Sequence, residues 1–263
     1  MTIDDLSPLA QELRAANSDY YLSTLFAPPA VRPALVALYA FDGELARIRN
    51  VVREPMAGLI RLQWWEDVID GFDGGGTIAH PVVEGLKRAV LDHALDAVCL
   101  KRAIEGRRRP FEMDVSPDQG AFERYLLDVG GNIAIGAAKL LGADKQQTVD
   151  CAARAGQVRA VWEQLSAFGT AAADREPWLP SAWLEESSDT GAMAARTRLA
   201  AWGLAELGRL RRESPSTPRP FLAAFFPGTL AGMRLRNPTG GSSVSTLPTA
   251  VPRLIWCWLR RRF

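Results

Sequence analysis

Apolar residues recur every three to four positions through most of the chain, which is the periodicity of amphipathic helices. Residues 33–52 are rich in Ala and Leu, Pro55 interrupts the pattern, and residues 56–72 resume it. Further helical segments are expected at residues 80–89, 92–106, 118–142, 145–168, 192–212 and 221–236. No alternating strand pattern of any length occurs. The sequence therefore predicts an all-α fold.

The end of the chain has a different composition. Gly, Ser, Thr and Pro are frequent up to Pro252, which is typical of a flexible linker, and residues 252–263 combine Trp and Leu side chains with four arginines. We therefore expect a helical domain over residues 1–240 and a linker with a short basic and aromatic tail over residues 241–263. Such a tail suits an anionic membrane surface, and docking on its own domain is the alternative.

Composition narrows the classes of function. The chain has 31 basic and 30 acidic residues, and this balance argues against a nucleic-acid partner. The three cysteines have no CxxC spacing, no signal-like apolar core opens the chain, and no run of about 18 apolar residues occurs. We therefore expect a cytoplasmic protein, with peripheral association on the inner face of the membrane as a further expectation. The two histidines, His80 and His93, are expected to be surface residues. The sequence has no hydrolase, nucleotide-phosphate or zinc-protease motif, so it gives no support to those activities.

Aromatic side chains concentrate on the predicted helices and either form plain core or line a cavity. The cavity or ligand candidates are Tyr20, Tyr21, Tyr39, Phe41, Trp64, Tyr125 and Trp162, together with Arg47. Trp64 and Trp65 are adjacent and cannot point the same way. Because Trp64 shares a face with Ile60 and Val68, we expect Trp64 to face the interior. Gly130 and Gly131 are expected to allow close helix packing or the approach of a ligand.

Several motifs occur in a characteristic order. They are Asp19-Tyr-Tyr21, Ala37–Phe41, Leu62-Gln-Trp-Trp65, Phe122–Tyr125, Val129-Gly-Gly131, Gly156 and Trp178-Leu-Pro180. In this order the chain resembles the squalene/phytoene synthase family over roughly residues 19–240. The resemblance implies an isoprenoid-synthase-like helical bundle around a central cavity. It is closest to the family's non-enzymatic branch, which includes a mitochondrial assembly factor for respiratory complex I, and so implies a respiratory-complex assembly partner.

The chain departs from the family where its catalysts carry two aspartate-rich motifs. In active members these carboxylates hold Mg²⁺, which binds the diphosphate of the prenyl substrate. The resemblance aligns the first motif with Ala46, Arg47 and Asn50, and the second with Ala167 and Ala171. The expectation is therefore that no metal cofactor is used, and Mg²⁺ at a non-standard site is the alternative. The acids that could form such a site are Asp42, Glu44, Asp67, Asp70 and Glu163.

Two arginine groups have more than one interpretation. Arg47, Arg49 and Arg53 could bind a carboxylate or phosphate without metal, or pair with neighbouring acids. Residues 107–109 form a run of three arginines that is typical of a solvated helix end, and an acidic partner or a lipid head group is the alternative.

Three functions remain open from the sequence. The first is a non-catalytic, membrane-associated assembly or lipid-binding factor that has lost the aspartate motifs. The second is an active prenyl-diphosphate condensing transferase with a non-standard metal site. The third is a carrier that holds a prenyl or other lipid ligand in an apolar pocket.

Overall fold

A computed structural model describes residues 7–74, 78–93, 95–168, 177–184, 189–213, 217–236 and 247–260. The first helices are α1 (Pro8–Ala16), α2 (Ser18–Thr24), α3 (Arg32–Val51), α4 (Pro55–Asp70), α5 (Pro81–His93) and α6 (Ala97–Glu112). They are followed by α7 (Gln119–Leu126), the π-helical segment η3 (Leu127–Gly131), α8 (Asn132–Leu140), α9 (Gln146–Ala167), α10 (Asp189–Glu213), α11 (Leu222–Leu235) and α12 (Leu247–Arg260). Over these residues the predicted all-α fold is confirmed.

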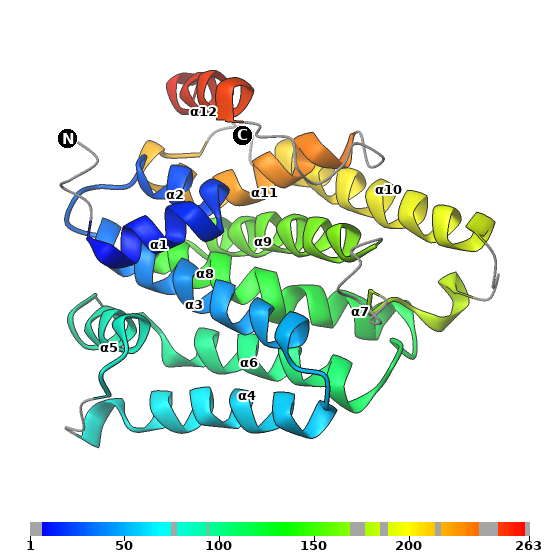
Figure 1. Cartoon of the computed structure of the whole chain (residues 1–263). Coiled ribbons are helices and arrows are strands. Elements are labelled where there is room, and N and C mark those ends of the chain that lie inside the picture. The colour runs from blue at the N-terminus through cyan, green and yellow to red at the C-terminus, as the bar shows by residue number, and fades with distance from the viewer. Residues whose placement is uncertain are drawn as a thin grey trace.

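Helix α9 lies at the centre of the bundle (Figure 1). It packs against α8 and η3 on one side and against α10 and α11 on another, while α4 and α6 form the lower layer of the view. Local chemistry sets the helix ends: the Asn17 side chain accepts from the backbone N–H of Tyr20 at the start of α2, and Pro55 occupies the first turn of α4. These residues fix where α2 and α4 begin.

Glycines bring the central backbones into direct contact. A Cβ at Gly130 would lie 2.3 Å from the carbonyl oxygen of Gly156, and a Cβ at Gly228 would lie 2.2 Å from that of Ala155. Segment η3 and helix α11 therefore both touch α9 with no side chain between. The cavity enclosed by these glycines and the rings of Tyr20 and Tyr39 measures about 10 Å³, close to the space that one water needs. This part of the expected central cavity is closed.

The buried face of α4 differs from the prediction. Trp65 is 4% exposed and contacts the Phe41 ring at 5.2 Å between centroids, whereas Trp64 is 41% exposed and Ile60 is 63% exposed. The expectation that Trp64 faces the bundle interior is wrong. The physical reason is the close approach of α6: a Cβ at Gly58 would lie 2.3 Å from the ring of Phe111, so the glycine fixes which side of α4 turns inward.

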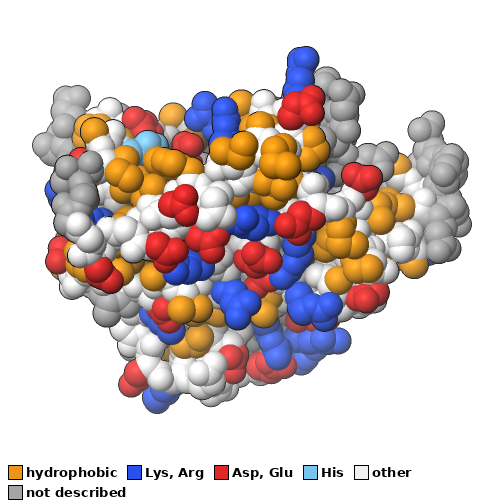
Figure 2. Space-filling view, turned by 90° about the horizontal axis from the view of Figure 1, so that it is seen from below, with side chains coloured by type: hydrophobic (Ala, Val, Ile, Leu, Met, Phe, Trp, Pro, Cys, Tyr) orange, Lys and Arg blue, Asp and Glu red, His pale blue; other side chains and the backbone are white. Residues whose placement is uncertain are grey.

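Figure 2 views the molecule from the side of α4 and α6, where apolar side chains lie among closely spaced charges of both signs. Ion pairs between these two helices, Lys101 with Asp70 and Arg108 with Glu66, cross this face. Such pairs are partly exposed and contribute little stability each.

The end of the chain is more ordered than a free tail. Helix α12 begins at Leu247, so residues 247–252 of the expected linker are helical. Leu254 and Cys257 are buried, and α12 contacts α11. Residues 241–246 and 261–263 lie outside the described ranges. Within those ranges, no helix combines the length and the apolar character needed to cross a membrane.

Candidate functional site

A fully buried carboxylate on α3 forms the inner end of the site. Asp42 has no exposed surface, and its Oδ2 accepts a 2.7 Å hydrogen bond from the Tyr20 hydroxyl. Two guanidinium groups complete its surroundings: Arg107 Nη2 donates to Oδ1 at 3.1 Å, and Arg159 Nη2 lies 3.0 Å from Oδ2. The carboxylate is therefore satisfied by charge-assisted contacts from α2, α6 and α9.

The same two arginines hold a second carboxylate. Glu163 on α9 accepts from both terminal nitrogens of Arg107, at 3.1 Å for the Nη2–Oε2 contact, and from Arg159 Nη1 at 2.7 Å. Asp42, Glu163, Arg107 and Arg159 thus form one group, which we call the buried charge network. Two carboxylates from different helices are joined by two guanidinium groups.

The network is electrostatically balanced. Burial alone would raise the pKa of Glu163, but Arg107 and Arg159 lower it to about 2. Burial disfavours the charged form of Arg107, and the neighbouring Glu163 and Asp42 overcome that effect and hold its pKa well above the usual value. The pKa of Arg159 is raised in the same way by Asp42, Tyr20 and Glu163. The arginines stay charged, and their charge stabilises the acids.

Two stacked tyrosines cover the network from the side of α2 and α3. The rings of Tyr20 and Tyr39 lie 4.1 Å apart and nearly parallel, and the Arg159 guanidinium lies 4.6 Å from the centre of the Tyr20 ring. The Tyr39 hydroxyl donates to the carbonyl of Ala223 on α11 at 3.3 Å. Burial raises the pKa of both phenols, so both act as hydrogen-bond donors.

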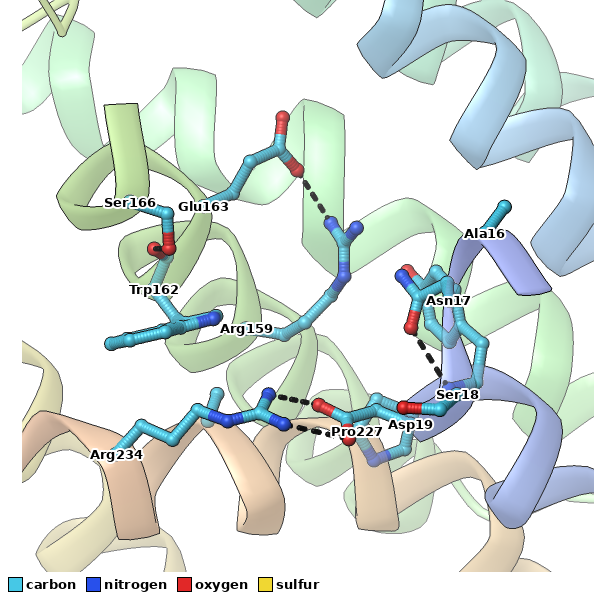
Figure 3. Close-up of a pocket in the computed structure, with 12 residues that line it drawn as sticks. Ala16, Asn17, Ser18, Asp19, Arg159, Trp162, Glu163, Ser166, Pro227 and Arg234 are labelled. Atoms are coloured by element: carbon cyan, nitrogen blue, oxygen red, sulfur yellow. Dashed lines mark hydrogen bonds and ion pairs between the residues drawn. The ribbon is translucent and has the colours of Figure 1, made fainter. Parts of the chain in front are cut away.

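An open pocket of about 290 Å³ lies outside the network, between α2, α9 and α11 (Figure 3). Arg159, Trp162 and Glu163 of α9 line it. Across the pocket, Arg234 binds the Asp19 carboxylate with both terminal nitrogens, at 2.9 Å for the Nη2–Oδ1 contact, and lies over the Trp162 ring. Both arginines that reach the pocket therefore already bind a carboxylate.

The acids that the sequence offered as metal ligands do not gather around one point. Of the candidate acids, the structure brings together Asp42 and Glu163, and guanidinium groups occupy the space between them. Within the described ranges, no group of three His, Cys, Asp or Glu side chains could hold a metal ion. Ala167 ends α9 and its side chain has no ligating atom, and Ala171 lies outside the described residues.

The other acidic candidates lie elsewhere on the surface. Glu44 pairs with Arg47 at 3.7 Å, and the Arg47 side chain is 71% exposed, so this arginine does not point into the interior. Asp67 accepts from Gln63, and Asp70 pairs with Lys101. None of these acids shares a site with the network.

The remaining aromatic candidates divide between core and pocket. The Tyr125 hydroxyl accepts from Gln164, whose oxygen in turn accepts from the backbone of Trp178, so Tyr125 belongs to a buried structural network. Phe41 is core, Tyr21 is half-buried beneath Arg14, and Trp162 lines the open pocket.

The sequence reasoning missed both arginines of the network. The expectation of a solvated end is wrong for Arg107, whose side chain is 8% exposed. A signal was present: Arg107 continues the spacing of Leu100, Ala103 and Ile104 along the buried face of α6. Arg159 likewise follows the small residues of the α9 face that meets η3.

The sequence matches the squalene/phytoene synthase family over residues 13–228. The chain belongs to that family. Among solved structures, a dehydrosqualene synthase in complex with ligand superposes with a TM-score of 0.75 at 14% identity, covering 94% of both chains. Squalene synthase HpnC from Alicyclobacillus acidocaldarius gives a TM-score of 0.68 at 16% identity, covering 92% of this chain and 93% of that one. These structures establish the shared isoprenoid-synthase fold.

The solved structures are synthases, whereas the similar curated proteins are described as complex I assembly factors. The "NADH dehydrogenase (ubiquinone) complex I, assembly factor 6" of Mus musculus is 26% identical over 168 residues, which is 64% of this chain and 50% of the relative. The Homo sapiens protein of that description is 24% identical over the same length, and a Drosophila melanogaster homolog is 35% identical over 96 residues, 34% of this chain and 29% of that one. The chain spans about half the length of the mammalian relatives.

Proposed function

We propose that this family member is a non-catalytic assembly factor for a respiratory complex and works at a membrane surface. The observation that carries the proposal is the pairing of Asp42 and Glu163 through Arg107 and Arg159. In a catalyst of this family, the cations between the two carboxylate motifs must be free to take a diphosphate. Here the positive charge belongs to side chains that the carboxylates already hold.

Diphosphate ionisation would have to compete with these contacts. A substrate diphosphate would need to pull Arg159 away from a fully buried Asp42, and breaking a buried ion pair leaves an uncompensated charge. Without a metal, the charge that develops on the leaving diphosphate also lacks its usual neutralisation. The geometry therefore favours a structural role for the network over a role in prenyl transfer.

The cavities beside the network do not favour a lipid at the centre of the bundle, and the open pocket of about 600 Å³ between α4 and α5 lies apart from that centre. The cavities on the two sides of Arg159 measure about 10 and 290 Å³, and the larger one is open and lined by paired charges. Pockets that enclose a drug-sized ligand usually span about 300–1,000 Å³ and are mainly apolar. Neither cavity suits a long prenyl chain.

Sequence similarity to the complex I assembly factors supports a respiratory complex as the partner. Their similarity covers 168 residues of this chain, and the proposal extends their described role to it. Helix α12 supports a membrane surface as the place of action, because it exposes Ile255, Trp256 and Leu259 beside basic side chains. Peripheral attachment on the inner face of the membrane follows from this proposal.

Deleting the coding sequence from the organism that makes this protein tests the function. We expect loss of assembled NADH:ubiquinone oxidoreductase on native gels, loss of its activity in membranes, and restoration of both by the full chain. Normal levels of the assembled complex, combined with a loss of a squalene or carotenoid product, would overturn the proposal in favour of the transferase.

A further inference from the structure

The open pocket of about 600 Å³ between α4 and α5 is mainly apolar. Its apolar side chains come from the end of α4, from the residues that follow it and from one face of α5, and they are Val68, Phe72, Ile78, Val83 and Leu91. Helix α4 packs on α6 and α5 packs on α3, so each wall of the pocket is held by a different neighbour. The volume is within the range of about 300–1,000 Å³ that ligand pockets usually span. The fold therefore builds this pocket and leaves it open.

An exposed apolar stripe on α4, on the side of the molecule that Figure 2 shows, leads into this pocket. Met56, Ile60 and Trp64 are 65%, 63% and 41% exposed, and their spacing of four residues places them on one face of the helix. Asp67, which lines the pocket, continues that face. The Trp64 ring also lies 6.1 Å from the ring of His80, the residue before α5. We call the stripe and the pocket together the α4–α5 groove.

The length of the groove indicates the shape of its occupant. Helix α4 has 16 residues, so the groove extends over about 24 Å, which is the length of a helix of about four turns. A ligand that filled the pocket alone would leave Met56 and Ile60 uncovered. Contiguous apolar side chains exposed in this way mark sites of interaction. The groove therefore suits an elongated apolar occupant.

Acidic side chains at the end of α4 oppose its helix dipole. The last turn has no basic residue, and Asp67 and Asp70 lie there instead. The C-terminal end of a helix carries partial negative charge, so acids at this position are unfavourable. Lys101 pairs with Asp70, whereas Asp67 accepts a 2.8 Å hydrogen bond from the neutral amide of Gln63. The fold accepts a repulsion at Asp67 that a basic partner would relieve.

The complete lining of the pocket has an excess of acids. Asp67, Glu84 and Asp92 carry negative charge, and Lys87 and Arg88 carry positive charge. Asp92 lies in the last turn of α5, so it too opposes a helix dipole. An occupant with basic side chains where it meets Asp67 and Asp92 would relieve both. Charge complementarity of this kind selects a partner and fixes its orientation.

We propose that the α4–α5 groove binds an amphipathic helix of a partner protein, with apolar side chains toward the groove and basic side chains on its flank. The inference rests on the proposed function and names the surface and the chemistry by which the partner is recognised. A helix lays apolar anchors, spaced by three to four residues, into a groove of this kind. An anionic lipid would bring its head group toward the carboxylates of Asp67 and Asp92, so the charges favour the basic helix.

Site-specific photocross-linking inside the deletion strain identifies the occupant. The full chain carries benzoylphenylalanine in place of Ile60 or, as the matched control, in place of Met193, an apolar residue of α10 that is 52% exposed. The cross-linked peptides are sequenced by mass spectrometry. We expect an adduct at Ile60 with a basic amphipathic helix of one protein, and no such adduct at Met193. An adduct with a lipid or with a second copy of this chain, the same adduct at both positions, or no adduct at Ile60 would overturn the proposal.

A charge reversal separates binding from stability. Asp67→Lys suits the C-terminal end of α4, so the thermal unfolding midpoint should stay the same or rise. We expect the variant to form about tenfold less adduct at Ile60, the effect of a residue near the centre of an interface. The matched control is Asp150→Lys on α9, because Asp150 is also exposed and accepts from a glutamine four residues earlier, at 2.7 Å. Equal amounts of adduct from the two variants would overturn the proposal.

The deletion strain keeps this inference apart from the proposed function. Asp150→Lys should restore assembled NADH:ubiquinone oxidoreductase, and Asp67→Lys should not, which would support both. Full restoration by Asp67→Lys would overturn the groove and leave the assembly role in place. If deletion leaves the complex intact and Ile60 still forms the adduct with a basic helix, the groove is supported and the proposed function is overturned.

Discussion

The Arg159 guanidinium lies 3.0 Å from the carboxylate of Asp42, which has no contact with solvent. The two residues belong to α9 and α3, the helices on which the family resemblance places the two aspartate-rich motifs. Arg107 joins the same carboxylate from α6. In this family member, two side-chain cations therefore join α3, α6 and α9 around two buried carboxylates.

Removing one cation from the network should destabilise the fold strongly. Arg107→Leu leaves Asp42 and Glu163 with one guanidinium between them, and losing one partner of a buried pair costs about 3–5 kcal/mol. Urea denaturation measures this free energy of unfolding. The control is Lys101→Leu, which removes the exposed pair with Asp70 and should change the free energy of unfolding only slightly. Similar costs for both variants would mean that the network contributes little.

Stability should depend on the protonation of Glu163 at acid pH. Its pKa in the folded protein, about 2, lies below the usual 4.5, so the stabilisation is complete above pH 4.5 and disappears as the pH falls toward about 2. Glu163→Gln has no such group to titrate. The stability difference between the two proteins should therefore shrink across this range, and a constant difference would show that Glu163 is not held by the arginines.

The central glycines should not tolerate a methyl group. Gly130→Ala would push a carbon against the carbonyl oxygen of Gly156, and the backbones of η3 and α9 would have to separate. We expect a loss of several kcal/mol in the free energy of unfolding. Gly43→Ala is the control: nothing lies within 4 Å of a Cβ there, it sits inside α3, and the change should stabilise by about 0.5–1 kcal/mol.

The two adjacent tryptophans of α4 should differ sharply. Trp65→Ala removes a buried ring that packs on Phe41 and should cost about 3–5 kcal/mol, whereas Trp64→Ala removes a side chain that is 41% exposed and should cost less than half as much. Chemical denaturation of the two variants measures the difference. A larger loss at Trp64 would restore the original sequence-based assignment of the inward face.

Periodicity and helix-breaking residues were enough to predict most of the helices, including the break before Pro55 and the close packing at Gly130. They did not predict which face of α4 turns inward, because Gly58 and the Phe111 ring decide that through contact with another helix. The pairing of Arg107 with Asp42 and Glu163 was also beyond the sequence pattern. It depends on how α3, α6 and α9 are placed in space, and a run of three arginines is locally the same whether one of them is buried or not.

The central claim is that the protein does not catalyse metal-dependent prenyl transfer, because the guanidinium groups of Arg107 and Arg159 hold the carboxylates of Asp42 and Glu163. Release of pyrophosphate from farnesyl diphosphate by the purified full chain, measured with and without Mg²⁺, tests it most directly. The buried pairing of Arg107 and Arg159 with Asp42 and Glu163 predicts the same release as in a protein-free control under both conditions. Mg²⁺-dependent release with formation of a carbon–carbon coupled product would contradict the account.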